Sequence, residues 1–189
     1  MNLSSLTEIV RLIETPSDDM RLIKRQLVAE APTSTLIAAL NAGTRPHTRW
    51  LICDVLGQQG DARAIPALLA CLNDESATMR AIAAESLGRL GSAEAGAALL
   101  ERFSDPHEDV GVRRMVGAAL GAVGYRPASA ALIEALADPD AGVRAGAALA
   151  LGTLKDSAGI APLKAAVANE TEWYPQRRMI DALVAIGET

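Results

Sequence analysis

Apolar residues recur along this chain with a helical period, and the pattern repeats in blocks of about thirty residues. Four segments share an arginine, a small residue four positions on, a leucine seven on and a glycine eight on. They are RWLICDVLGQQG from Arg49, RAIAAESLGRLG from Arg80, RRMVGAALGAVG from Arg113 and RAGAALALGTLK from Arg144. Their glycines are Gly57, Gly88, Gly121 and Gly152, which are 31, 33 and 31 residues apart. Self-similarity at this period predicts a solenoid of stacked helical repeats.

A second helical pattern lies between the arginine-led segments. Its apolar residues stand three and four positions apart, which places them on one face of a helix. This pattern covers residues 65–72, 95–103, 128–136 and 160–167. The expected helix starts, at which Asp and Ser are good N-caps, are Asp61, Ser92, Tyr125 and Asp156. Gly60, Gly91 and Gly124 stand just before three of them and are expected to end the preceding helices. The predicted unit is therefore helix, turn, helix, turn.

Each turn inside a unit carries an aspartate. Asp74 and Asp138 precede the arginine of their repeat by six positions, whereas Asp105 precedes Arg113 by eight because SDPHEDVGV contains a two-residue insertion. An arginine in the first turn of a helix faces the positive end of the helix dipole, so a compensating partner is expected. We predict a ladder of Asp–Arg hydrogen bonds from repeat to repeat, formed by Asp74, Arg80, Arg113, Asp138 and Arg144. The alternative is a row of guanidinium groups that binds anions.

The repeat pattern D-x-x-x-x-[VM]-R-x-x-A-A-x-x-L-G-x-[LV]-G, as in Asp74–Gly91, resembles the HEAT repeat. It is most similar to the short type named after phycobilisome lyases. The well-matched repeats cover about residues 44–155, and degenerate repeats cover about 1–43 and 156–189. The resemblance implies an all-α fold, a right-handed α-α superhelix of about six helical hairpins, in a single repeat domain over residues 1–189.

Composition narrows the possible partners. Half of the residues are hydrophobic but only 3% are aromatic, which suits closely packed helices. The net charge of -5 argues against a nucleic-acid partner, because such proteins concentrate positive charge. The chain has no apolar run long enough to span a bilayer, and its opening residues do not resemble a secretory signal. We therefore expect a cytoplasmic protein with no membrane partner.

Few residues suggest chemistry. Cys53 and Cys71 lack the spacing of metal ligands and are expected to be buried, inert thiols, with a redox or disulfide role as the alternative. The dipeptide His107–Glu108 resembles one of the iron-ligand pairs of HEAT-like deoxyhypusine hydroxylases, but that resemblance would require several such pairs. With only two histidines, His47 and His107, no catalytic set can be assembled. We expect no catalytic residues, no metal and no other cofactor.

Positions at which the repeats differ are the candidates for binding, since structural positions recur. The HEAT resemblance implies that the arginine-led helices line the concave side. At one, two and five residues past the arginine, the chain carries a partly apolar row with acidic residues toward one end. We predict that a partner binds Trp50, Leu51, Asp54, Ile82, Glu85, Arg114, Met115 and Leu149. The alternative is that these side chains pack between helices. Trp173–Tyr174 is a second candidate, and its alternative is a hydrophobic staple.

Three functions are compatible with the sequence. The favoured one is a non-catalytic scaffold that binds a protein or peptide on its concave face. The resemblance to phycobilisome lyases implies the second, a bilin lyase subunit or bilin-handling protein. A DNA-repair or RNA-binding role is the third, and the acidic charge and scarcity of aromatic residues disfavour it.

Overall fold

The chain forms paired helices throughout the part that the computed structural model describes, residues 3, 5–15 and 19–187. These residues contain no strand. The contacts divide the chain into two compact units, Met1–Leu90 and Gly91–Thr189, each with three helical pairs. The predicted all-α helical-repeat fold is confirmed. The expectation of a single domain over residues 1–189 stays a prediction.

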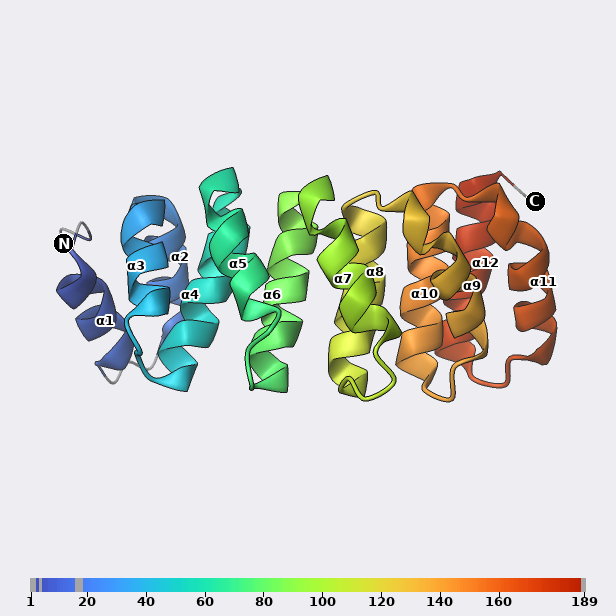
Figure 1. Cartoon of the computed structure of the whole chain (residues 1–189), viewed down its shortest axis with the longest axis horizontal. Coiled ribbons are helices and arrows are strands. Elements are labelled where there is room, and N and C mark those ends of the chain that lie inside the picture. Colours follow the sequence, from blue (N-terminus) through green and yellow to red (C-terminus); the bar gives the residue numbers. More distant parts are fainter. Residues whose placement is uncertain (1–2, 4, 16–18, 188–189) are drawn as a thin grey trace. The chain divides into compact units, whose positions relative to one another are not determined.

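The first unit has two layers of helices (Figure 1). In chain order its elements are α1 (Leu6–Glu14), α2 (Met20–Glu30), α3 (Thr33–Asn41), α4 (Pro46–Gln59), the 3-10 helix η1 (Ala62–Ala64), α5 (Ile65–Cys71) and α6 (Ala77–Leu90). The second helices of the pairs form one layer, because α4 packs against both α2 and α6. Leu56 and Leu87, the leucines of the repeat pattern, point into the core between the layers and are fully buried.

The second unit repeats this arrangement with its own core (Figure 1). Its elements are η2 (Ala93–Ala95), α7 (Gly96–Ser104), α8 (Val110–Ala122), η3 (Arg126–Ala128), α9 (Ser129–Glu134), η4 (Ala135–Ala137), α10 (Ala141–Leu154), η5 (Ser157–Gly159), α11 (Ile160–Asn169) and α12 (Trp173–Ile186). Here α10 packs between α8 and α12. The pattern leucines Leu120 and Leu151 are again fully buried.

Local capping chemistry sets where the helices start and stop. The four predicted helix starts are the N-cap residues of the short 3-10 helices that open the first helix of a pair. The side chains of Asp61 and Asp156 accept hydrogen bonds from backbone N–H groups two residues on, at 2.9 and 3.0 Å. The three predicted terminating glycines have φ of 72°, 65° and 72°. At the corresponding place after α10, Lys155 adopts φ of 49°, a conformation that disfavours a residue with a Cβ.

The glycines of the repeat pattern allow second helices to approach closely. A Cβ atom added to Gly121 would lie 2.6 Å from the Cα of Ala150, and one added to Gly152 would lie 2.8 Å from the Cα of Ala182. In the first unit, a Cβ atom on Gly57 would lie 2.5 Å from the Cβ of Ser86. These glycines therefore have a packing role, as their recurrence predicts.

Candidate partner-binding surface

The arginines that open the second helices connect the turns of successive pairs. In the first unit, Arg49 Nη2 donates to Asp74 Oδ2 at 2.7 Å. In the second unit, Arg113 Nη2 donates to Asp138 Oδ2 at 2.6 Å, and Arg144 Nε donates to Glu170 Oε2 at 2.6 Å. Each of these carboxylates comes from the turn of the following pair. The hydrogen bonds from Arg144 hold the pKa of Glu170 below its usual range.

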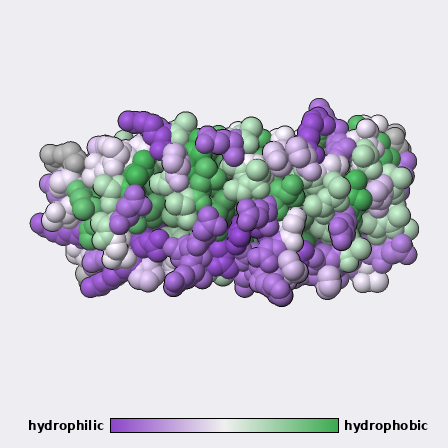
Figure 2. Space-filling view, in the orientation of Figure 1, coloured by the Kyte–Doolittle hydropathy of each residue, from purple (hydrophilic) through white to green (hydrophobic). Residues whose placement is uncertain are grey.

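Two of the predicted arginines contact the turn of their own repeat through its backbone. Arg80 Nη1 donates to the carbonyl oxygen of Asp74 at 2.8 Å, and Arg144 Nη1 donates to that of Asp138 at 2.9 Å. The expected contact between a turn aspartate and its own arginine thus uses the main chain. In each unit, hydrophilic side chains gather along the edge that contains these turns, the lower edge in Figure 2. Each of these arginines makes contacts with a turn, which argues against a row of guanidinium groups that serves only to bind anions.

The second helices of the first unit surround a pocket of about 390 Å³. Its lining comes from α2, α4 and α6, and comprises Lys24, His47, Trp50, Leu51, Asp54, Ile82, Glu85 and Arg89. Five of these are the residues of the predicted row that belong to this unit. The shared offset places them together because equivalent positions on neighbouring helices of a stack fall side by side.

One half of this pocket is apolar. Trp50, Leu51 and Ile82 are half-buried, so they are neither enclosed between helices nor fully exposed. The ring of His47 meets that of Trp50 edge-on, with centroids 6.5 Å apart. Leu51 and Ile82 both retain accessible surface and line the pocket, so neither is fully buried between helices.

The other half of the pocket is charged and internally neutralised. Asp54 forms ion pairs with Lys24 and, at 2.5 Å, with Arg89. Arg89 also reaches Glu85 at 2.5 Å. Burial raises the pKa of Asp54, but hydrogen bonds from Lys24 and Arg89 outweigh it, and the pKa lies below its usual value. Asp54 and Glu85, the acidic residues of the row, therefore have counterions within the pocket, so they do not require a basic partner.

The predicted row looks different in the second unit. Arg114 lies across α10, where its Nε and Nη2 donate to the two carboxylate oxygens of Asp140 at 2.8 Å each. Gly142 makes room for it, because a Cβ atom there would lie 2.3 Å from Arg114 Nε. Met115 is half-buried and Leu149 is 41% exposed. Arg114 is thus already paired with Asp140.

Three residues of the first unit's pocket were not predicted as part of it. Arg89 follows Glu85 by four positions on the same helix face, so its place was available from the spacing. Lys24 lies on α2, three positions past Arg21, and this offset is not one of those of the predicted row. His47 precedes Trp50 by three positions and lies before Arg49, outside the offsets of the predicted row.

The aromatic pair at the start of α12 is solvent-exposed. Trp173 is 78% exposed and meets Tyr174 edge-on at 5.7 Å, while the guanidinium of Arg178 lies 5.5 Å from the Tyr174 ring centroid. An exposed Trp173 does not fit the alternative of a hydrophobic staple, which would bury it against the helix.

Other candidates for chemistry are also placed by the structure. Cys53 and Cys71 are buried and form no disulfide, and the contact with Cys71 together with burial raises the pKa of the Cys53 thiol. Within residues 3, 5–15 and 19–187, no group of three or more His, Cys, Asp or Glu side chains is arranged to hold a metal ion. No helix of this described part is long and apolar enough to cross a membrane.

Paired helices, buried pattern leucines and inter-repeat arginines define a helical-repeat protein of the solenoid class. The family model of HEAT repeats matches residues 33–111 and 106–184, which together are more than half of the chain. The chain belongs to the HEAT-repeat family. Comparison with curated proteins gave no match.

Solved structures share the fold. A chain from the complex of CpcE and CpcF of phycocyanin lyase from Nostoc sp. PCC7120 is 24% identical, with a TM-score of 0.67 over 97% of this chain and 77% of that chain. A designed armadillo repeat protein is 14% identical, with a TM-score of 0.62 over 97% of this chain and 100% of that one. The fold thus agrees with the resemblance to phycobilisome-lyase-type repeats.

Proposed function

We propose that the protein is a non-catalytic scaffold that binds a protein or peptide partner on the second-helix face of its first unit. The observation that carries the proposal is the open apolar half of the pocket, formed by Trp50, Leu51 and Ile82. Apolar side chains left accessible together favour a partner that covers them. A tryptophan in such a patch supplies a large contact area.

The neighbouring charges support an apolar contact group rather than a basic one. Lys24, Asp54, Glu85 and Arg89 neutralise one another at the edge of the pocket. A charged partner group would have to compete with these contacts. A leucine-like or aromatic side chain, presented on a helix or an extended segment, gains from Leu51 and Ile82 without disturbing the ion pairs.

The test compares affinity capture from native lysate by three proteins. The Leu51→Glu/Ile82→Glu variant places two charges in the pocket, and Leu22→Glu places one on α2, where Leu22 is 60% exposed and outside the pocket lining. Circular dichroism first establishes that all three are folded. We expect the double variant to lose partners that both wild type and Leu22→Glu retain. Retention of every partner by the double variant would remove the proposal.

A second candidate is a bilin lyase subunit or a bilin-handling protein. It is favoured by the fold likeness to a chain of the phycocyanin lyase complex. Mixing the protein with a free bilin and recording the visible absorption spectrum distinguishes the two. A shifted and intensified band favours the bilin role, whereas an unchanged spectrum together with a captured protein partner favours the scaffold.

A further inference from the structure

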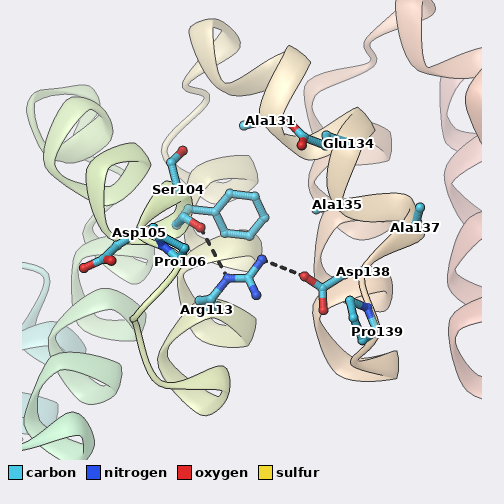
Figure 3. A pocket seen from close by; sticks show the side chains of 11 residues that line it. Ser104, Asp105, Pro106, Arg113, Ala131, Glu134, Ala135, Ala137, Asp138 and Pro139 are labelled. Atoms are coloured by element: carbon cyan, nitrogen blue, oxygen red, sulfur yellow. Dashed lines mark hydrogen bonds and ion pairs between the residues drawn. The ribbon is translucent and has the colours of Figure 1, made fainter.

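The second unit contains a pocket that differs chemically from the site proposed above. It has a volume of about 530 Å³ and lies between α7 and α9, with Arg113, Phe103 and Ala135 in its lining (Figure 3). An equivalent pocket of about 500 Å³ lies one pair further on, between α9 and α11, with Arg144 in the corresponding place. The two pockets form a natural comparison, because they occupy the same position in successive repeats.

The arginine in the second of these pockets has all its donors occupied. A guanidinium group has five N–H donors. Arg144 Nε and Nη2 donate to the two oxygens of Glu170 at 2.6 and 2.9 Å, and Nη2 also donates to Glu172 at 3.0 Å. Its Nη1 donates to the carbonyl oxygens of Asp138 and Pro139 at 2.9 and 3.0 Å. This group has no donor left for a ligand.

The arginine in the first pocket keeps free donors. Arg113 donates through Nε to the carbonyl oxygen of Phe103 at 3.4 Å and through Nη2 to Asp138 at 2.6 Å (Figure 3). Within the described part of the chain, its Nη1 has no hydrogen-bond partner. The Arg113 side chain is 22% exposed, so these donors are accessible from the pocket.

The two-residue insertion in SDPHEDVGV explains the difference. In the 138–144 turn, the carbonyl groups six and five residues before the arginine point back to it. The corresponding offsets before Arg113 fall on His107 and Glu108, in the lengthened turn, and their carbonyl oxygens accept no hydrogen bond from it among the described residues. The insertion thus leaves Nη1 of Arg113 without the backbone contacts that Nη1 of Arg144 makes.

The remaining lining selects the kind of ligand. Asp138 already neutralises Arg113, so the free N–H groups suit a neutral acceptor such as a peptide carbonyl better than an anion. Glu134 lines the same pocket from α9 and is exposed, with no ion pair or hydrogen bond to any described residue. Ala131 and Ala135 give the α9 side a small apolar wall.

We propose that this pocket binds a peptide segment that carries a lysine or arginine side chain. A backbone carbonyl of the segment accepts from Arg113, the methylene groups lie along Ala131 and Ala135, and the terminal cation pairs with Glu134. The net charge of -5 on the whole chain favours a basic ligand as well.

The test uses two capped tripeptides as probes, acetyl-Gly-Lys-Gly-amide and its norleucine counterpart, titrated into the ¹⁵N-labelled full chain. We expect the lysine peptide to shift the backbone amide signals of Ser104, Glu134 and Ala135 and to bind about threefold to fivefold more tightly than the norleucine peptide. The amides of Ala165 and Asn169, in the pocket around Arg144, should not move. Equal affinity for the two peptides, or no shift around Glu134, would overturn the proposal.

Two variants separate the contacts. Glu134→Gln should weaken the lysine peptide about threefold to fivefold and leave the norleucine peptide unchanged, whereas Glu101→Gln, at an exposed position on α7 outside the pocket, should change neither. Arg113→Lys keeps the charge toward Asp138 but removes the guanidinium edge, so it should weaken both peptides alike. Identical effects of Glu134→Gln and Glu101→Gln would contradict the assignment.

Discussion

The second-helix faces of the two units are built on the same repeat but present different surfaces. In the first unit, Trp50, Leu51 and Ile82 leave an open apolar pocket beside a neutralised set of charges. In the second unit, Met115 and Gly146 take the places of Leu51 and Ile82, and Arg114 is paired with Asp140 at the start of α10. This comparison shows that the recurring residues determine the backbone of the repeat. The residues at the variable offsets determine whether the second-helix face has an open apolar pocket.

The largest expected effect is at the edge of the second unit. Arg144→Ala leaves Glu170, whose side chain is 4% exposed, without its counterion, and should lower the free energy of unfolding by about 3 kcal/mol. Chemical denaturation measures this loss. Arg177→Ala is the control, because its ion pair with Asp181 is solvent-exposed and should contribute less than about 1 kcal/mol. Equal losses of unfolding free energy in the two variants would show that the ion pair of Arg144 and Glu170 does not stabilise the second unit more than an exposed ion pair does.

Overpacking should affect the second unit next most strongly. Gly121→Leu forces a side chain against the backbone of Ala150, so the free energy of unfolding should fall by about 2 kcal/mol. Ala122→Leu, one residue along α8 at an exposed position, should have little effect. If both variants had the wild-type melting temperature, the packing of α8 against α10 would not depend on the glycine at position 121.

The Asp140 anchor should give a smaller, pH-dependent effect. The hydrogen bond from Arg114 lowers the pKa of Asp140 to about 2, so its stabilising contribution is complete above about pH 4 and is lost as the pH falls toward 2. Asp140→Asn retains an N-cap side chain but removes the charge. Because Arg114 is half-exposed, we expect a loss of about 0.5 kcal/mol at pH 7. The difference from wild type should shrink by pH 2.5, and a constant difference would contradict the anchor.

The smallest expected effect is at the helix ends. Lys155→Gly relieves a left-handed backbone conformation and should stabilise the protein by about 0.5 kcal/mol. The reverse change, Gly124→Lys, places a side chain at φ of 72° and should destabilise it by about 1 kcal/mol. Thermal unfolding of the two variants measures both signs. A lower melting temperature for Lys155→Gly would mean that Lys155 has a further role in this unit.

Features that depend on local chemistry were predictable from the sequence. Asp61 and Asp156 were expected at helix starts because an N-cap needs only the next few residues. Leu51 and Ile82 were placed on one face by their shared offset. These predictions depend on neighbouring residues or on the repeat offset, and not on how far a long side chain extends.

Contacts that long side chains make with residues of other segments were not predictable from the sequence. The carboxylate of Asp74 accepts from the backbone N–H of Ser76 at 2.9 Å and from Arg49 of the preceding pair, so its own Arg80 contacts the carbonyl group instead. The rotamers of Arg49 and Arg80 decide which oxygen atom of Asp74 each arginine contacts. Lys24 reaches Asp54 from the preceding pair, at an offset from Arg21 that is not part of the predicted row.

The central claim is that the pocket around Trp50 binds a partner, and Trp50 itself provides the most direct measurement. In the Trp173→Phe protein, Trp50 is the sole tryptophan. A partner recovered by capture is produced without tryptophan and added back while the emission maximum and acrylamide quenching of Trp50 are recorded. The account predicts a blue-shifted emission and reduced quenching, because the partner covers the apolar half of the pocket. Binding that leaves both properties of Trp50 unchanged would contradict it.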